Sequence, residues 1–311
     1  MPRQARIDIP GGLYHVIARG NERREIFCDD SDYKEFYKRA AQAVSETGQK
    51  CLAWALIPNH FHLLILRGKR PLSDTMRKLM TGYAGYFNRR YRRAGHLFQD
   101  RYKAVLCQEE EYLHEVAAYI HLNPMRAGLV KRYKDLAGYK WCGHGEVLAG
   151  GGLVARDYLL EHFGDREAAA IKKYDLFVEE RVGLYKRGEY SGGGLIRSAG
   201  GYEAAAGLAR RGEKELSDER VLGGGDFVAS VLKELDAVAN QKASKAEVIA
   251  EVTKLTGLRK DFIFKHDRTP DAVTAKALYC YLMREKCGAK GVELMKELGL
   301  SSGAISHLCQ K

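Results

Sequence analysis

The stretch "CLAWALIPNHFHLLIL", residues 51–66, places the strongest constraint on the fold of this chain. Two apolar runs of strand length flank Pro58-Asn59, and a proline followed by an asparagine is typical of a turn. The pattern therefore predicts two strands joined by a short turn. Because alternate residues of a strand project from the same face, His60 and His62 share one face and Phe61 points to the other.

The segments on either side of this strand pair predict a β-α-β-β-α-β order. Alternation predicts a strand from Leu13 to Arg19, and Ser31 with Asp32 caps a helix in "SDYKEFYKRAAQAVSETG". After the strand pair, "LSDTMRKLMTGYAGYFNRRY" predicts a helix with one apolar face, formed by Met76, Leu79, Met80, Tyr83 and Phe87. "FQDRYKAVLC" predicts the last strand. This order is typical of the ferredoxin-like α+β fold, in which helices pack on one face of an antiparallel sheet.

An additional helix is expected directly after the last strand. The segment "EEEYLHEVAAYIHLN" has helical character, and Pro124 follows it, which cannot continue a helix comfortably. Tyr119 and Asn123 are four residues apart, so both project from the same face of this helix. Either Tyr119 packs in the core and Asn123 caps the helix end, or both side chains take part in chemistry.

His60 and His62 also allow two interpretations. A single histidine on a strand is commonly a hydrogen-bonded core residue. A pair on one face lies roughly 6.6 Å apart along the strand, which lets both imidazoles bind one metal ion at about 2 Å. Two histidines leave the coordination incomplete, and the amide oxygen of Asn123 is a candidate third ligand. Together with the phenol of Tyr119, these groups suffice to cut a phosphodiester.

The charge of the chain favours an acidic partner, with nucleic acid as the first candidate. Lys and Arg outnumber Asp and Glu by 51 to 40, and the isoelectric point is about 9.2. The excess lies mainly in residues 67–103 and in the last sixty residues. A solvated basic face would explain either region alone, whereas both together suggest two nucleic-acid contacts. The candidate contacts before residue 145 are Arg19, Asn21, Arg89, Arg90, Arg101 and Lys103.

The expected location is the cytoplasm. No stretch has the roughly 20 apolar residues of a membrane span, so no membrane contact is expected. The first residues, "MPRQARIDIPGG", contain no apolar signal core. The seven cysteines include no CxxC pair, and we expect them to be reduced thiols.

Three blocks are expected along the chain, at residues 1–145, 146–240 and 241–311. The middle block contains the glycine clusters "LAGGGL", "YSGGGLIRSAGG" and "VLGGGDF". None of them has the spacing of a phosphate-binding loop, so we interpret them as hinges and helix ends in an all-α linker region. The last block predicts an all-α domain that ends in a helix-turn-helix. Gly299 would form the turn, and the helices would pack through Leu294, Leu298, Leu300, Ile305 and Leu308.

The polar side of the second helix of this motif is the expected contact with duplex DNA. Ser302, Ser306 and His307 would enter the major groove. Arg268, in the loop before the long helix, would reach a phosphate or the minor groove. A helical hairpin without any DNA-binding role would show the same apolar pattern.

Four segments of residues 1–145 carry a resemblance to a known family. They are "YHVIARGNERREIF", "LIPNHFHLLI", "GHLFQDRYKAVL" and "YLHEVAAYIHLNPMRAGLV". In this order they resemble the REP-associated tyrosine transposases of the HUH superfamily of single-strand DNA endonucleases, whose His-hydrophobe-His motif is here His60-Phe61-His62. More weakly, "SSGAISH" and the basic loop "KHDRTP" resemble the DNA-binding domain of the chromosomal replication initiator. The aspartate usual before the first of these is absent, so the resemblance does not extend to the target sequence.

The resemblance implies a site and an activity. His60, His62 and Asn123 would bind Mg²⁺ or Mn²⁺, and Tyr119 would be the nucleophile. The enzyme would nick and join single-stranded, REP-like hairpin DNA through a covalent 5′-phosphotyrosine. Related insertion-sequence enzymes work as dimers, whereas the REP-associated enzymes are more similar to monomeric ones. We therefore expect either a monomer or a homodimer. The alternative is a catalytically retired transposase that acts as a DNA- or RNA-binding regulator.

Overall fold

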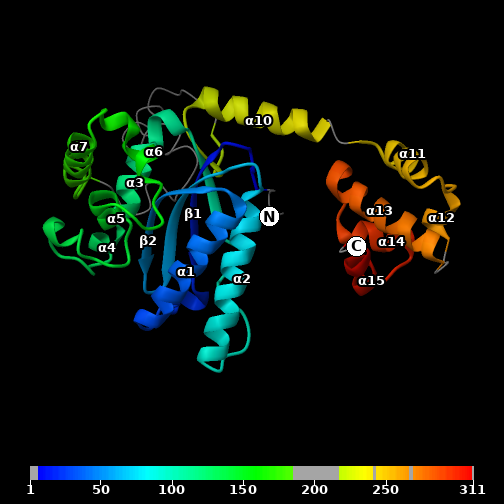
Figure 1. The fold of residues 1–311 in the computed structure, drawn as a ribbon, viewed down its shortest axis with the longest axis horizontal. Coiled ribbons are helices and arrows are strands. Elements are labelled where there is room, and N and C mark those ends of the chain that lie inside the picture. The colour runs from blue at the N-terminus through cyan, green and yellow to red at the C-terminus, as the bar shows by residue number, and fades with distance from the viewer. Residues whose placement is uncertain (1–5, 185–216, 241–242, 266–268, 310–311) are drawn as a thin grey trace, which may run out of the picture. The chain divides into compact units, whose positions relative to one another are not determined.

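The chain divides into two compact units, residues 1–231 and 232–311. The computed structural model describes residues 6–184, 217–240, 243–265 and 269–309 (Figure 1). Among these, no helix combines the length and the apolar character needed to cross a membrane.

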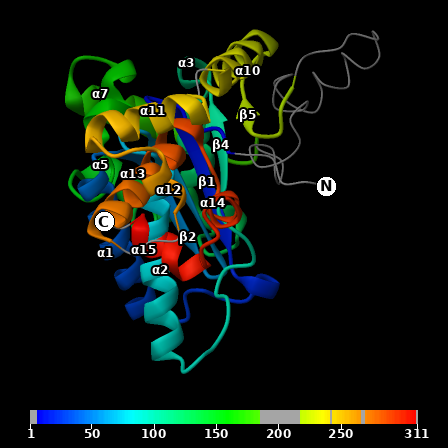
Figure 2. The same cartoon turned by 90° about the vertical axis from the view of Figure 1, so that its right-hand side faces the viewer.

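The first unit is built on a five-stranded mixed sheet with the order β2-β3-β1-β4-β5. Its strands are β1 (Leu13–Arg19), β2 (Lys50–Ile57), β3 (His60–Leu66), β4 (Lys103–Cys107) and β5 (Val221–Leu222). The first four pair antiparallel, whereas β5 runs parallel to β4, beside it at the sheet edge (Figure 2). A purely antiparallel sheet was therefore the wrong expectation, because β5 comes from the segment expected to be all-helical.

The β2-β3 hairpin is the centre of the predicted pattern, and it forms as predicted around Pro58 and Asn59. Ile57 pairs with His60 across the turn, and Ala55 pairs with His62. On the other side of β3, strand β1 pairs Arg19 with His60 and Ile17 with His62. Directly paired residues lie on the same face of a sheet, so these positions share the histidine face.

Helices cover both faces of the sheet. Helices α1 (Asp30–Thr47) and α2 (Leu72–Arg90) lie side by side on the face of Phe61, where Phe36 contacts the Phe61 ring at 4.7 Å between centroids (Figure 1). Helix α3 (Glu109–His121) covers the histidine face, followed by the short α4 (Asn123–Arg126). The additional helix is therefore on the opposite side of the sheet from α1 and α2.

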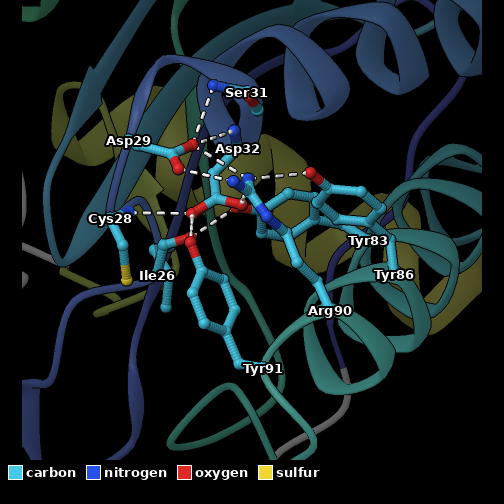
Figure 3. A network of polar contacts seen from close by, with 9 residues as sticks. All are labelled: Ile26, Cys28, Asp29, Ser31, Asp32, Tyr83, Tyr86, Arg90 and Tyr91. Atoms are coloured by element: carbon cyan, nitrogen blue, oxygen red, sulfur yellow. Dashed lines mark hydrogen bonds and ion pairs between the residues drawn. The ribbon is translucent and has the colours of Figure 1, made fainter.

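The start of α1 differs from the prediction. Asp29 is the capping residue, and its carboxylate accepts hydrogen bonds from the backbone NH groups of Ser31 and Asp32. Asp32 is fully buried and accepts hydrogen bonds from Cys28 N at 2.9 Å, Arg90 Nη1 at 2.7 Å and the Tyr91 hydroxyl at 2.7 Å (Figure 3). Asp32 therefore does not cap α1 but ties its start to the end of α2.

The residues after α4 continue the first unit. Helices α5 (His144–Ala149), α6 (Arg156–Leu160) and α7 (Glu167–Glu179) each contact α3. Strand β5 leads into α10 (Gly225–Asn240), within which the first unit ends at Val231. The cluster at Gly150, Gly151 and Gly152 has φ angles of 84°, 80° and 85°, so this stretch ends α5 in a conformation that favours glycine. The cluster at 190–201 lies outside the described residues.

The second unit is helical in its described residues. It contains α11 (Lys245–Thr256), α12 (Asp261–Phe264), α13 (Pro270–Cys287), α14 (Gly291–Leu298) and α15 (Ser302–Leu308). The predicted apolar residues Leu294, Leu298, Ile305 and Leu308 are buried in one core together with α11 and α13. Gly299 ends α14 with φ 63°, and the Ser301 side chain caps α15. Two helices joined by a short turn thus occur where the sequence predicted them.

Candidate active site on the histidine face of the sheet

His60 and His62 lie together at the start of β3. Their ring centroids are 5.0 Å apart, and the rings are nearly perpendicular. His60 is half-buried, while His62 is only 4% exposed. The alternation of the strand thus places both imidazoles on the face that α3 covers.

Tyr119 approaches the same face from α3. Its ring is edge-on to His62 at 6.3 Å and to His15 at 5.9 Å between centroids, and the residue is 4% exposed. The other tyrosine of this helix, Tyr112, lies seven residues earlier, about 10 Å along the axis at 1.5 Å per residue. The structure therefore brings Tyr119, and not Tyr112, to the histidines.

Asn123 begins α4, one turn after Tyr119. Its amide nitrogen donates to the carbonyl oxygens of Tyr119 at 3.1 Å and Ile120 at 3.3 Å. The amide thus caps the end of α3, as one interpretation held. Because these two contacts use the nitrogen, Oδ1 is the atom that this side chain would offer to a cation.

Arg126 is a site residue that the sequence reasoning missed. Its guanidinium carbon lies 4.1 Å from the centroid of the Tyr119 ring, and its Nη1 donates to the Tyr119 carbonyl oxygen at 3.1 Å. A cation over an aromatic face is attracted by the ring quadrupole. Arg126 therefore fixes the ring and the backbone of Tyr119. The signal for it is the position seven residues after Tyr119, two turns along the same face.

His15 is a second residue that was missed. It is fully buried on β1, its ring stacks on His62 at 5.2 Å between centroids, and its Nε2 is 2.9 Å from His62 Nδ1. The signal is the register, since Ile17 pairs with His62 and His15 is two residues away on the same face.

Asn59 holds His60 in a similar way. Its Oδ1 is 2.6 Å from His60 Nδ1, and its amide nitrogen donates to the Arg23 carbonyl oxygen at 3.1 Å. The loop that supplies this carbonyl has two residues with left-handed φ, Glu22 at 54° and Arg23 at 62°. A Cβ atom on Gly20 would lie 2.2 Å from the Arg24 carbonyl oxygen, so the loop requires glycine there.

The donor set fits a divalent cation. Burial lowers the pKa of His62 well below its usual value, and the neighbouring His15 and His60 lower it further. A neutral imidazole is the form that binds a metal. The Nε2 atom of His62 is buried and has no hydrogen-bond partner in the described part of the chain. No group of three or more His, Cys, Asp and Glu side chains among the described residues would hold a metal. The Oδ1 atom of Asn123 is the third ligand that the sequence predicts.

The proposed DNA contacts of the first unit differ in their exposure and in their partners within the protein. Arg19 and Lys103 are exposed on the histidine face, paired with His60 and with Ile17. Arg89 and Arg101 are exposed, and Asn21 is half-buried. Arg90 forms ion pairs with the carboxylates of Asp29 and Asp32, so its positive charge is balanced within the protein (Figure 3).

In the second unit, the polar positions of the predicted recognition helix are exposed. Ser302, Ser306 and His307 all lie on the surface of α15, while Ile305 and Leu308 face the core. Arg268 lies outside the described residues.

Another buried histidine pair joins α3 to α5, since His121 is the last residue of α3 and His144 is the first of α5. The ring centroids are 5.6 Å apart, the Tyr174 hydroxyl is 2.8 Å from His121 Nδ1, and His144 Nε2 is 3.3 Å from the Asp175 carboxylate. The sequence offered no signal for this pair, because its members come from distant segments without a motif.

Part of the chain matches a known protein family. Residues 10–123 match the family model described as "Transposase IS200 like", and this segment contains His60, His62, Tyr119 and Asn123. This part of the chain is similar to IS200-like transposases. Among solved structures, a REP-associated tyrosine transposase bound to a REP hairpin matches at 19% identity with a TM-score of 0.41, over 50% of this chain and 90% of that chain. No curated protein matches the chain.

Proposed function

We propose that the first unit is a transposase-type, metal-dependent enzyme that nicks and joins single-stranded DNA through Tyr119. The observation that carries this proposal is the position of the Tyr119 ring, edge-on to His62 at 6.3 Å within a segment similar to IS200-like transposases. A buried phenol beside two histidines has the geometry of a nucleophile next to a cation site.

The proposed reaction transfers the phosphate at the cleavage site to Tyr119. The Tyr119 oxygen attacks the scissile phosphorus and loses its proton, and the bond between phosphorus and the 3′-oxygen breaks. The departing 3′-oxygen takes up a proton, and a 5′-phosphotyrosine remains. A 3′-hydroxyl of another strand reverses the same exchange and joins the strands. Arg126 and the packing of α3 hold the tyrosine ring, while Arg19 and Lys103 face the phosphates of the strand.

His60 Nε2, His62 Nε2 and Asn123 Oδ1 are the atoms that would hold the metal. A bound divalent ion draws charge from a non-bridging phosphate oxygen and orients the phosphate. Two imidazoles favour Mn²⁺ or a later transition metal by ligand preference, whereas phosphate oxygens and the amide suit Mg²⁺. We therefore expect activity with either ion and tighter binding of Mn²⁺.

The substrate follows from the resemblance of residues 1–145 to the REP-associated transposases, which implies single-stranded DNA with hairpin ends. Labelled hairpin DNA from the flanks of the gene is incubated with the protein, with and without Mn²⁺, and the covalent adduct is resolved on a denaturing gel. The wild-type protein and the Tyr112→Phe control should form the adduct, whereas Tyr119→Phe should bind the hairpin without forming it. An adduct with Tyr119→Phe would assign the nucleophile to another residue.

The regulator alternative makes the opposite prediction in the same experiment. A retired transposase binds the hairpin through its basic residues but forms no adduct with any metal. The wild-type lane therefore separates the two functions.

The second unit is proposed to bind duplex DNA through α15. The supporting observation is that Ser306 and His307 are exposed while Ile305 and Leu308 hold the helix in the core. In a gel shift of the full chain at two salt concentrations, His307→Ala should narrow the difference in affinity between preferred and random duplexes. The control is His162→Ala, an exposed histidine of the first unit. Equal discrimination by both variants would remove α15 from the interface.

A further inference from the structure

We propose that His15 is a positioning residue that accepts a hydrogen bond from Nδ1–H of His62 and so keeps the lone pair of His62 on Nε2, toward the cation. This inference rests on the proposed function, since it concerns the same metal site. It adds a residue that neither the His-hydrophobe-His motif nor the Tyr119 helix contains.

The contact between the two rings is built into the sheet. His15 Nε2 and His62 Nδ1 are 2.9 Å apart, and the rings stack with 26° between their planes. His15 is fully buried on β1, and the antiparallel register of β1 and β3 fixes its distance from His62. The register fixes the separation of the two backbones, and the burial of both rings restricts their positions.

The direction of the hydrogen bond follows from the other nitrogen of His62. Between two neutral imidazoles, one nitrogen donates and the other accepts. If His62 carried its proton on Nε2, a buried donor would be left without an acceptor in the described part of the protein. With the proton on Nδ1, the donor is paired with His15, and Nε2 presents a lone pair, as a metal ligand requires.

His60 shows the same arrangement with a different partner. The amide nitrogen of Asn59 donates to the Arg23 carbonyl, so its oxygen faces His60 Nδ1 and accepts from it. This leaves the proton of His60 on Nδ1 and its lone pair on Nε2. Hydrogen-bond acceptors behind metal-binding histidines fix the ring orientation and raise ligand basicity. Asn59 thus shows this arrangement behind His60, and His15 occupies the corresponding place behind His62.

The first test is the tautomer of His62 in the metal-free protein. Long-range ¹H–¹⁵N correlation spectra of ¹⁵N-histidine-labelled protein, with His62→Ala used to assign the signals, report which ring nitrogen carries the proton. We expect the proton on Nδ1. A proton on Nε2 would make His15 the donor and overturn the inference without reference to any metal.

The second test is the affinity for Mn²⁺, measured by calorimetric titration of two variants. His15→Phe keeps an aromatic ring in the stack and removes the acceptor, whereas His15→Gln retains an oxygen near the position of Nε2. Loss of such an acceptor typically weakens metal binding about 10- to 100-fold, so His15→Phe should fall in this range and His15→Gln should stay within a few-fold of wild type. Wild-type affinity in a folded His15→Phe, or equal losses in both variants, would overturn the inference.

His62→Ala separates this inference from the proposed function. If this variant binds Mn²⁺ as tightly as wild type, the metal site is wrong, and the tautomer of His62 still decides the direction of the hydrogen bond. If His62→Ala lowers the affinity for Mn²⁺ but His15→Phe does not, the proposed metal site is supported and the proposed role of His15 is wrong.

Discussion

Two buried histidine pairs, one against α3 and one that includes its last residue, differ in their neighbours. His15 and His62 lie against Tyr119, beside the half-buried His60. His121 and His144 are instead surrounded by Tyr174, Tyr133 and Asp175, which supply hydroxyl and carboxylate partners. Both pairs contain a ring nitrogen without a partner among the described residues, so this feature alone does not identify a reactive site. The ring of Tyr119 and the half-buried His60 are the neighbours that distinguish the first pair.

The second pair belongs to a group of contacts that hold α3 from the side away from the sheet. We call this group the brace, and it consists of the contacts Tyr174–His121, Arg181–Glu115 and Leu159–His114. On α7, Tyr174 bonds to His121, and just beyond its end Arg181 makes a forked contact with the Glu115 carboxylate at 3.0 Å. His114 Nε2 is 3.1 Å from the carbonyl oxygen of Leu159. Residues outside the segment that matches the family therefore position the helix that carries Tyr119. This gives a structural role to a region whose sequence offered no functional signal.

The largest difference in Mn²⁺ affinity is expected between variants that lose a proposed metal ligand and a variant that loses a histidine of the second pair. His60→Ala and His62→Ala should each lower Mn²⁺ affinity by more than roughly 100-fold, the upper end of losses seen for supporting residues alone, and should abolish the adduct. His144→Ala should keep Mn²⁺ affinity within a few-fold, because His144 is not part of the proposed ligand set. Calorimetric titration with Mn²⁺ measures both. Unchanged affinity in the first two variants would make their histidines core residues like the second pair.

A smaller effect on stability is expected from Tyr174→Phe. The change removes the hydroxyl that pairs with His121 Nδ1 at 2.8 Å in a fully buried position. An unpaired buried polar group typically costs about 1–3 kcal/mol, so the free energy of unfolding should fall by that amount. Both tryptophans, Trp54 and Trp141, lie in the first unit, so their fluorescence during urea denaturation follows this unit.

The control for this measurement is Tyr281→Phe, which removes a hydroxyl from an exposed tyrosine of the second unit. Its urea midpoint should equal that of wild type. Equal midpoints for Tyr174→Phe and wild type would mean that the bond to His121 does not contribute to the brace.

The sequence predicted the elements that depend on local pattern. The β2-β3 hairpin forms where alternation and Pro58-Asn59 placed it, and the helical period put Tyr119 on the face that meets the histidines. Of the two residues that were missed, Arg126 lies close to Tyr119 in the sequence, whereas His15 depends on pairing between distant segments. His15 reaches His62 only through the register of β1 with β3, which a local pattern does not encode.

Other differences arise because tertiary contacts override local signals. Asp29 and Asp32 are both suitable helix caps by residue type, and the buried contacts of Asp32 with Arg90 and Tyr91 leave the cap to Asp29. Strand β5 has two residues, too few for any alternation to be visible, and it forms through backbone hydrogen bonds such as Leu106 N to the Arg220 carbonyl oxygen at 2.8 Å.

Arg181→Lys should lower the free energy of unfolding less than Tyr174→Phe. Arg181→Lys keeps the charge opposite Glu115 but loses the fork, since an ammonium presents no planar pair of donors. Partly exposed ion pairs contribute little, so the loss should stay below about 1 kcal/mol. The same urea titration measures it. A loss as large as that of Tyr174→Phe would show that the ion pair, and not the buried hydroxyl, dominates the brace.

The smallest expected effect is a pH dependence carried by His114, which lies in the brace. Burial is the main cause that lowers the pKa of His114 below 6.5, His162 and Arg181 lower it further, and the Leu159 carbonyl and Glu115 oppose the shift. Between the lowered pKa and 6.5, the unfolded chain binds more protons at this residue than the folded chain, so stability falls as the pH falls through this window. His114→Gln keeps a donor for Leu159 and cannot titrate. From pH 7.5 to about 5.5, spanning the ordinary histidine pKa, the wild type should therefore lose more unfolding free energy than this variant. Because His62 and His121 titrate in both proteins, the difference between the two slopes isolates His114, and parallel slopes would show that the brace leaves its pKa unshifted.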